Sequence, residues 1–201
     1  MQKQIFFIPF FLFLMSTASF AFQSDVIRNT QKVEKLKNYF HKSFEKPDSL
    51  KYRNLFFEAF PNSFSELDSL YGYNDGKAGP LYDEGVDHII VLFNKLDSIP
   101  DSIYFEKLIN VSFEGSWDAD AINYFQHGLH QRSLEKPELL FSLLQNYPDK
   151  KVQSFFHFFY DGVHPPFEEI PADFQNLNSQ YPTLYSLMKK EFTSALSKNK
   201  H

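Results

Sequence analysis

Apolar residues return every three or four positions along most of this chain, and this spacing restricts the fold more than any other feature of the sequence. It places apolar side chains on one face of an α-helix, whereas a half-buried strand needs strict alternation. The clearest series is Val86, Ile89, Ile90, Phe93 and Leu96. An earlier series of the same kind is Val33, Leu36, Phe40 and Phe44. Strand patterns are scarce, so the sequence predicts an all-α fold.

Proline followed by an acidic residue marks four expected helix starts. Proline at the first helical position loses no needed hydrogen bond, and a carboxylate beside it faces the positive end of the helix dipole. Ser63 and Glu66 match a capping box, in which a hydroxyl and a carboxylate satisfy free amide groups. The four pairs are Pro47-Asp48, Pro100-Asp101, Pro137-Glu138 and Pro148-Asp149. We expect about eight amphipathic helices from Asp25 to about Ser197, stacked as an antiparallel bundle or a short α-solenoid.

One segment fits both kinds of secondary structure. Ile109, Val111 and Phe113 alternate as in a short strand. Tyr104, Leu108 and Val111 have helical spacing, and we predict a helix there.

Two stretches of the chain resemble one another. Residues 41–48 read HKSFEKPD, and residues 130–138 read HQRSLEKPE. This similarity has two explanations: an old duplication of a helix-turn-helix unit, or two ordinary helix ends that are each followed by a helix start.

The first 21 residues have the pattern of a secretory signal peptide. Lys3 precedes an apolar run from Ile5 to Met15, and small residues lead to an expected cleavage after Ala21. An uncleaved anchor fits less well, because Pro9 interrupts a run shorter than the roughly 20 apolar residues of a spanning helix. We therefore expect a protein of the bacterial periplasm or the cell exterior, without a stable membrane anchor after cleavage. Residues 22–201 should form a single helical domain.

Composition excludes several classes of function. The chain has no cysteine, which rules out disulfides, thiol catalysis and cysteine metal sites. Its net charge of −5 disfavours nucleic acid as a partner, since a phosphate backbone needs a basic patch. Glycine-rich nucleotide-binding motifs are missing too, so we expect no cofactor.

Two loops and one short patch are the candidate binding segments. The first loop, residues 71–85, is rich in glycine and tyrosine, and the second, residues 161–171, contains closely spaced prolines. Functional residues are disproportionately found on such loops. The patch surrounds the only tryptophan, where Ser116 or Asp118 can also cap the next helix. The candidate binding residues are Tyr71, Tyr73, Asp75, Tyr82, Asp83, Trp117, Asp118, Asp120, Asp161 and His164.

A metal or acid-base site is the alternative interpretation of the same region. His127 and His130 are three apart on an expected helix and could face one ion, with Asp118 or Asp120 as a further ligand. The favoured interpretation of the pair is two surface or capping histidines. His157 and Asp161, followed by His164, could orient a general base, but the chain offers no recognisable nucleophile motif.

These observations favour a non-enzymatic role over catalysis. The leading hypothesis is an exported protein-binding protein, for instance an inhibitor or immunity-type protein. The competing hypothesis is a metal-assisted or acid-base hydrolase that acts on cell-envelope material.

Overall fold

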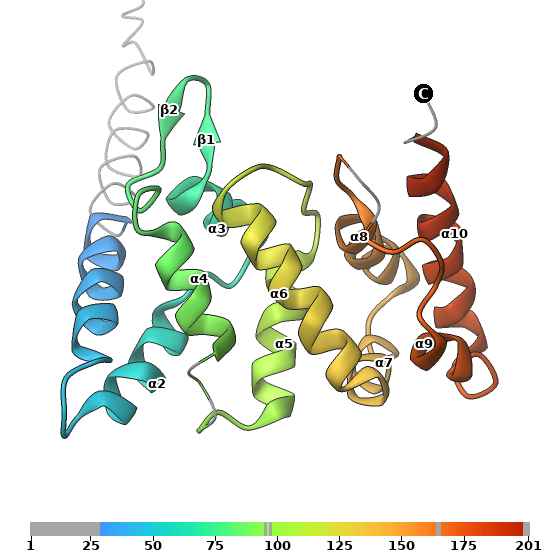
Figure 1. Ribbon diagram of the computed structural model, residues 1–201, viewed down its shortest axis with the longest axis horizontal. Helices are drawn as coiled ribbons and strands as arrows, with labels where there is room; N and C mark the ends of the chain where they lie inside the picture. The colour runs from blue at the N-terminus through green and yellow to red at the C-terminus, as the bar shows by residue number, and fades with distance from the viewer. Residues whose placement is uncertain (1–28, 95, 97, 164–165, 199–201) are drawn as a thin grey trace, which may run out of the picture.

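The computed structural model describes residues 29–94, 96, 98–163 and 166–198, and these residues form an all-α fold. The expected signal peptide, and the expected helix start at Asp25, lie outside the described residues. Helices stack beside one another from the N-terminal to the C-terminal part of the chain along the long axis of the molecule (Figure 1). The elements are the helical residues 29–42, α2 (Ser49–Ala59), α3 (Phe64–Tyr71), β1 (Tyr73–Asn74), β2 (Lys77–Ala78), α4 (Gly85–Asn94), α5 (Asp101–Ser112), α6 (Ala121–Glu135), α7 (Pro137–Leu144), α8 (Asp149–Tyr160), α9 (Ala172–Asn176) and α10 (Pro182–Lys198).

The expected start signals coincide with helix starts. Helices α5, α7 and α8 begin within their proline-acid pairs, and α2 begins one residue after its pair. At α3, Ser63 Oγ accepts a hydrogen bond from the Glu66 amide at 3.3 Å. In a capping box the Glu66 carboxylate would accept a hydrogen bond from the amide of Ser63. Here Glu66 Oε2 accepts from the amide of Asn62, one residue earlier, at 2.9 Å. Helix α5 also confirms the predicted helix across residues 104–111.

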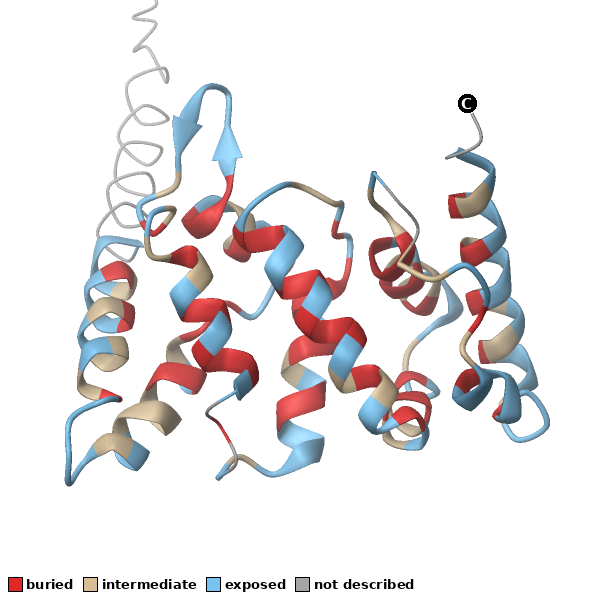
Figure 2. Ribbon diagram, viewed as in Figure 1, coloured by how far each residue is buried: buried red, intermediate tan, exposed pale blue. Residues whose placement is uncertain are grey.

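The core is built largely from phenylalanine, and buried positions follow the inner faces of the helices (Figure 2). Helices α8 and α10 pack on each other, as do α4 and α6. At the second contact a Cβ atom added to Gly128 would lie 2.4 Å from Phe93 Cδ2. Glycine therefore permits the close approach of α4 and α6.

Two histidines are part of this core. His88 is fully buried against Phe40 and Phe56, and its Nδ1 hydrogen bonds to the Tyr71 hydroxyl at 2.9 Å. His130 is also buried, and its Nε2 hydrogen bonds to the Phe159 carbonyl oxygen. Burial lowers the pKa of each imidazole to about 4, so both are neutral at pH 7.

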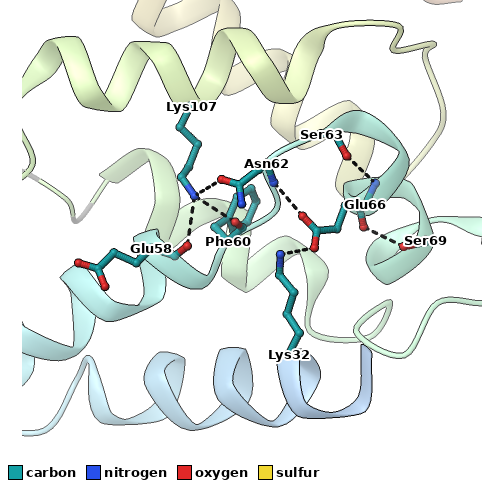
Figure 3. Close-up of polar contacts among 8 residues, drawn as sticks. All are labelled: Lys32, Glu58, Phe60, Asn62, Ser63, Glu66, Ser69 and Lys107. Carbon is teal, nitrogen blue, oxygen red and sulfur yellow. Dashed lines mark hydrogen bonds and ion pairs between the residues drawn. The ribbon is translucent and has the colours of Figure 1, made fainter. Parts of the chain in front are cut away.

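Lysine side chains connect the first helices to their neighbours (Figure 3). Lys107 Nζ on α5 donates to the Phe60 carbonyl at 3.0 Å and to Asn62 Oδ1 at 2.9 Å, just after α2 ends. Burial lowers the pKa of Lys107 to about 8. Lys32 pairs with Glu66 and so joins the first described helix to α3.

Two expectations about this part of the chain are wrong. Phe44 was expected in the apolar stripe of residues 33–44, but the helix ends at residue 42 and the Phe44 side chain is 57% exposed. Residues 71–85 do not form a single loop, because Tyr71 belongs to α3 and residues 73–78 form a β-hairpin. Among the described residues, no helix has the length and apolar character needed to cross a bilayer.

Candidate functional site

The β-hairpin projects from the upper edge of the molecule in Figure 1 and forms the centre of the candidate site. Tyr73 pairs with Ala78 and Asn74 with Lys77, leaving Asp75 and Gly76 as the two turn residues. Both turn residues have positive φ, 50° and 77°, as a type I′ turn requires. The Tyr73 side chain remains 55% exposed, and its ring centroid lies 5.7 Å from that of Tyr82.

A hydrogen bond joins this hairpin region to the segment before α6. The Tyr82 hydroxyl donates to Asp120 Oδ2, and this bond is the main cause that raises the pKa of Tyr82. Asp120 has φ 56° and ψ −126°, which strains a residue with a Cβ atom. It directly precedes α6, but neither its side chain nor that of Ser116 or Asp118 provides the expected cap. The Asp120 side chain points to Tyr82 instead.

The end of α8 joins the same surface. Asp161 Oδ2 accepts a hydrogen bond from the Trp117 amide at 2.9 Å, and Gln126 Nε2 donates to the Asp161 carbonyl at 2.7 Å. The Trp117 indole donates to Asn123 Oδ1 at 3.1 Å and is half-buried. Three segments that are distant in sequence therefore meet. We use the name hairpin surface for eight residues of these segments: Tyr73, Asp75, Tyr82, Asp83, Trp117, Asp118, Asp120 and Asp161.

One of the predicted binding residues, Tyr71, is not part of this surface. Tyr71 is fully buried, and its hydroxyl is bonded to His88, so it cannot contact a partner. Burial raises the pKa of Tyr71 well above its ordinary value. His164 lies outside the described residues.

The expected metal pair is divided between core and surface. His130 is directed to the Phe159 carbonyl inside the protein. His127 is exposed and contacts the side chain of Gln131, with 3.2 Å between His127 Nε2 and Gln131 Nε2. Asp118 and Asp120 are not brought to either ring. In the part of the chain that the structure describes, no three His, Asp or Glu residues are placed to hold a metal ion.

The expected acid-base pair is not formed either. Asp161 bonds to the Trp117 amide, whereas His157 Nδ1 lies 3.4 Å from Glu191 Oε2 on α10. His157 and Glu191 border an open cavity of about 480 Å³. The sequence could not indicate this pairing, because the two residues lie on different helices.

Sequence reasoning also missed Asn123 and Gln126, which position Trp117 and Asp161. Gln126 is buried on the inner face of α6, and a buried amide on an otherwise apolar face is the one available signal. No family model matches the chain, and searches of curated proteins and solved structures give no match.

Proposed function

We propose that this chain is an exported, non-enzymatic protein-binding protein of the inhibitor or immunity type, and that its partner docks on the hairpin surface. The observation that supports this most is the hydrogen bond from Tyr82 to Asp120, which joins the hairpin to the tryptophan segment. It links Tyr73, whose ring centroid lies 5.7 Å from that of Tyr82, to the segment that carries Trp117.

The chemistry of this surface suits protein recognition. Tyrosine and tryptophan contribute large contact areas at a low cost in side-chain entropy, and they are common at the energetic centres of interfaces. The surrounding carboxylates of Asp75, Asp83 and Asp118 would steer a partner with a positive surface. Because Tyr82 and Asp120 already hold the segments together, less ordering is needed on binding.

Site-specific photocrosslinking in cells of the source organism tests the proposal. A photoreactive residue at Tyr73 should capture one defined protein species. The same residue at Ile103, which is 53% exposed on α5, is the control and should not capture that species. Capture of the same species at both positions, or of none at Tyr73, contradicts the proposal.

A second measurement uses the purified partner. Tyr73→Ala and Trp117→Ala should each weaken binding by about tenfold or more, as at other aromatic interface centres. Tyr82→Phe removes only the hydroxyl that bonds to Asp120 and should also weaken binding. Its matched control is Tyr124→Phe, since Tyr124 is 47% exposed on α6 and is not part of the hairpin surface. Equal affinities of the two phenylalanine variants would show that the Tyr82 bond has no role in recognition.

A further inference from the structure

A second exposed surface lies on the edge of the molecule opposite the hairpin, where the chain turns from the helix of residues 29–42 into α2 (Figure 1). Residues 44–48 of this turn are all exposed. Two large apolar side chains project there: Phe44 is 57% exposed and Leu50 is 55% exposed. We name this region the basic tip, consisting of Lys42, Phe44, Lys46, Leu50 and Lys51.

The charge of this region differs from that of the whole chain. Residues 42–51, which span the basic tip, contain three cations, Lys42, Lys46 and Lys51, and two anions, Glu45 and Asp48, which gives a local charge of +1. The chain as a whole has a net charge of −5. The basic tip is therefore a positive and apolar surface on an acidic protein.

The lysines of the basic tip are free to meet an external anion. Three lysines elsewhere on the surface are bound to carboxylates: Lys37 to Glu84, Lys136 to Asp101 and Lys151 to Glu114. Within the described residues, none of the three basic-tip lysines has a carboxylate partner. Lys42 and Lys51 instead place their ammonium groups 5.1 Å and 5.6 Å from the Tyr52 ring centroid.

The shape of this surface favours a lipid partner. A protruding turn needs a matching pocket on a rigid protein, whereas a bilayer interface deforms around it. Phenylalanine and leucine insert at the boundary between headgroups and acyl chains, and lysine stems extend so that their ammonium groups reach the phosphates. Each lysine near an anionic membrane contributes attraction that salt screens.

We propose that the basic tip contacts the surface of an anionic lipid bilayer. Phe44 and Leu50 enter the interface, and Lys42, Lys46 and Lys51 bind lipid phosphates. The hairpin projects from the opposite edge of the molecule, so this orientation directs the hairpin away from the bilayer (Figure 1).

Vesicle co-sedimentation of the purified full-length gene product, with its amino terminus identified by mass spectrometry, tests this proposal. Vesicles of phosphatidylcholine with phosphatidylglycerol are compared with vesicles of phosphatidylcholine alone. The protein should bind the anionic vesicles more strongly, and binding should decrease in high salt. The double variant Phe44→Ser/Leu50→Ser should lower the partition coefficient by about tenfold.

Matched variants distinguish vesicle binding by the basic tip from non-specific adsorption. Val163 is 58% exposed in the segment after α8, so Val163→Ser should leave binding unchanged. Lys46→Gln/Lys51→Gln should reduce binding several-fold, and Lys189→Gln/Lys190→Gln on α10 should reduce it much less. All variants share the same amino terminus, so any contribution of the expected signal peptide is common to them.

Three results would overturn the proposal. One is equal binding to anionic and neutral vesicles, and another is unchanged binding in the Phe44→Ser/Leu50→Ser variant. The third is absence of vesicle binding together with self-association or binding to polyglutamate that this variant abolishes. That result would assign the basic tip to a second copy of the chain or to an acidic protein.

Discussion

The stretches 41–48 and 130–138 have similar sequences but form different junctions between helices. In the first, the helix ends at residue 42, and the chain turns through exposed residues before α2 begins at Ser49. In the second, α6 continues to Glu135 and α7 begins at Pro137, with only Lys136 between them. The same order of residue types therefore gives an open turn in one place and a tight junction in the other.

Contacts with other helices account for the difference. In the second stretch, Arg132 donates to the Phe93 carbonyl of α4, and Lys136 pairs with Asp101 of α5. In the first, Ser43 Oγ donates to the Phe40 carbonyl at 2.6 Å, a local bond that competes with continuation of the helix. A junction sequence thus indicates where the chain changes direction, and the neighbouring helices decide how much of it is buried.

Lowering the pH should give the largest effect on stability in this comparison. His130 of the second stretch is buried, whereas His41 at the corresponding position of the first is exposed. Burial lowers the pKa of His130 to about 4, from 6.5 in an unfolded chain. The unfolded chain therefore binds more protons between these values. The contribution of neutral His130 to stability is complete above pH 6.5 and is lost as the pH falls towards 4. The expected loss in unfolding free energy is on the order of 3 kcal/mol.

Chemical unfolding at several pH values between about 7.5 and 4 measures this loss. His130→Gln should reduce the dependence of the unfolding free energy on pH relative to the unsubstituted protein. The reduction should be partial, because burial also lowers the pKa of His88, which therefore contributes to the same pH dependence. An unchanged pH dependence in the His130→Gln variant would contradict this interpretation of His130.

Phe44 and Leu134 each follow the serine of their stretch. Truncating them should give the next largest difference in unfolding free energy. Leu134 packs against the core, and its counterpart Phe44 is 57% exposed. Leu134→Ala should lower the unfolding free energy by about 2 kcal/mol through lost burial and a partial cavity. Phe44→Ala should change it by about 0.5 kcal/mol or less. Denaturant unfolding at pH 7 distinguishes the two, and equal losses would mean that the turn is packed in solution.

The two serines should give the smallest effects, with opposite signs. Ser43 Oγ is bonded to Phe40, whereas Ser133 Oγ is buried and has no hydrogen-bond partner among the described residues. Ser43→Ala should destabilise the protein by about 1 kcal/mol, and Ser133→Ala should be neutral or stabilise it by up to about 1 kcal/mol. Thermal unfolding of the two variants in parallel shows the signs. Destabilisation by Ser133→Ala would indicate that its hydroxyl has a partner, such as a bound water molecule.

Local sequence signals predicted most of the fold. Proline-acid pairs and the capping box act within a few residues, so they could be recognised without knowledge of the packing. The hairpin was harder, because strands of two residues are too short to show alternation, although Asp75-Gly76 is a typical turn pair. Exposure of Phe44 could not be predicted, because the helical spacing continues past the residue at which the helix ends.

The candidate site could be predicted only as separate segments. Tyr82 and Asp120 are 38 residues apart, and Trp117 and Asp161 are 44 apart. No local pattern specifies such pairs, because they depend on how α4, α6 and α8 pack. Burial of Tyr71 follows from the same packing, since its hydroxyl bonds to His88 on α4.

The close approach at Gly128 has a consequence for evolution. Any side chain at this position would meet the Phe93 ring, so drift at one of the two sites is constrained by the other. In homologous sequences, glycine should therefore persist wherever an aromatic residue occupies position 93. Replacement of the glycine by alanine should occur together with a smaller residue at position 93, and this correlated substitution would identify distant relatives whose overall sequences have diverged.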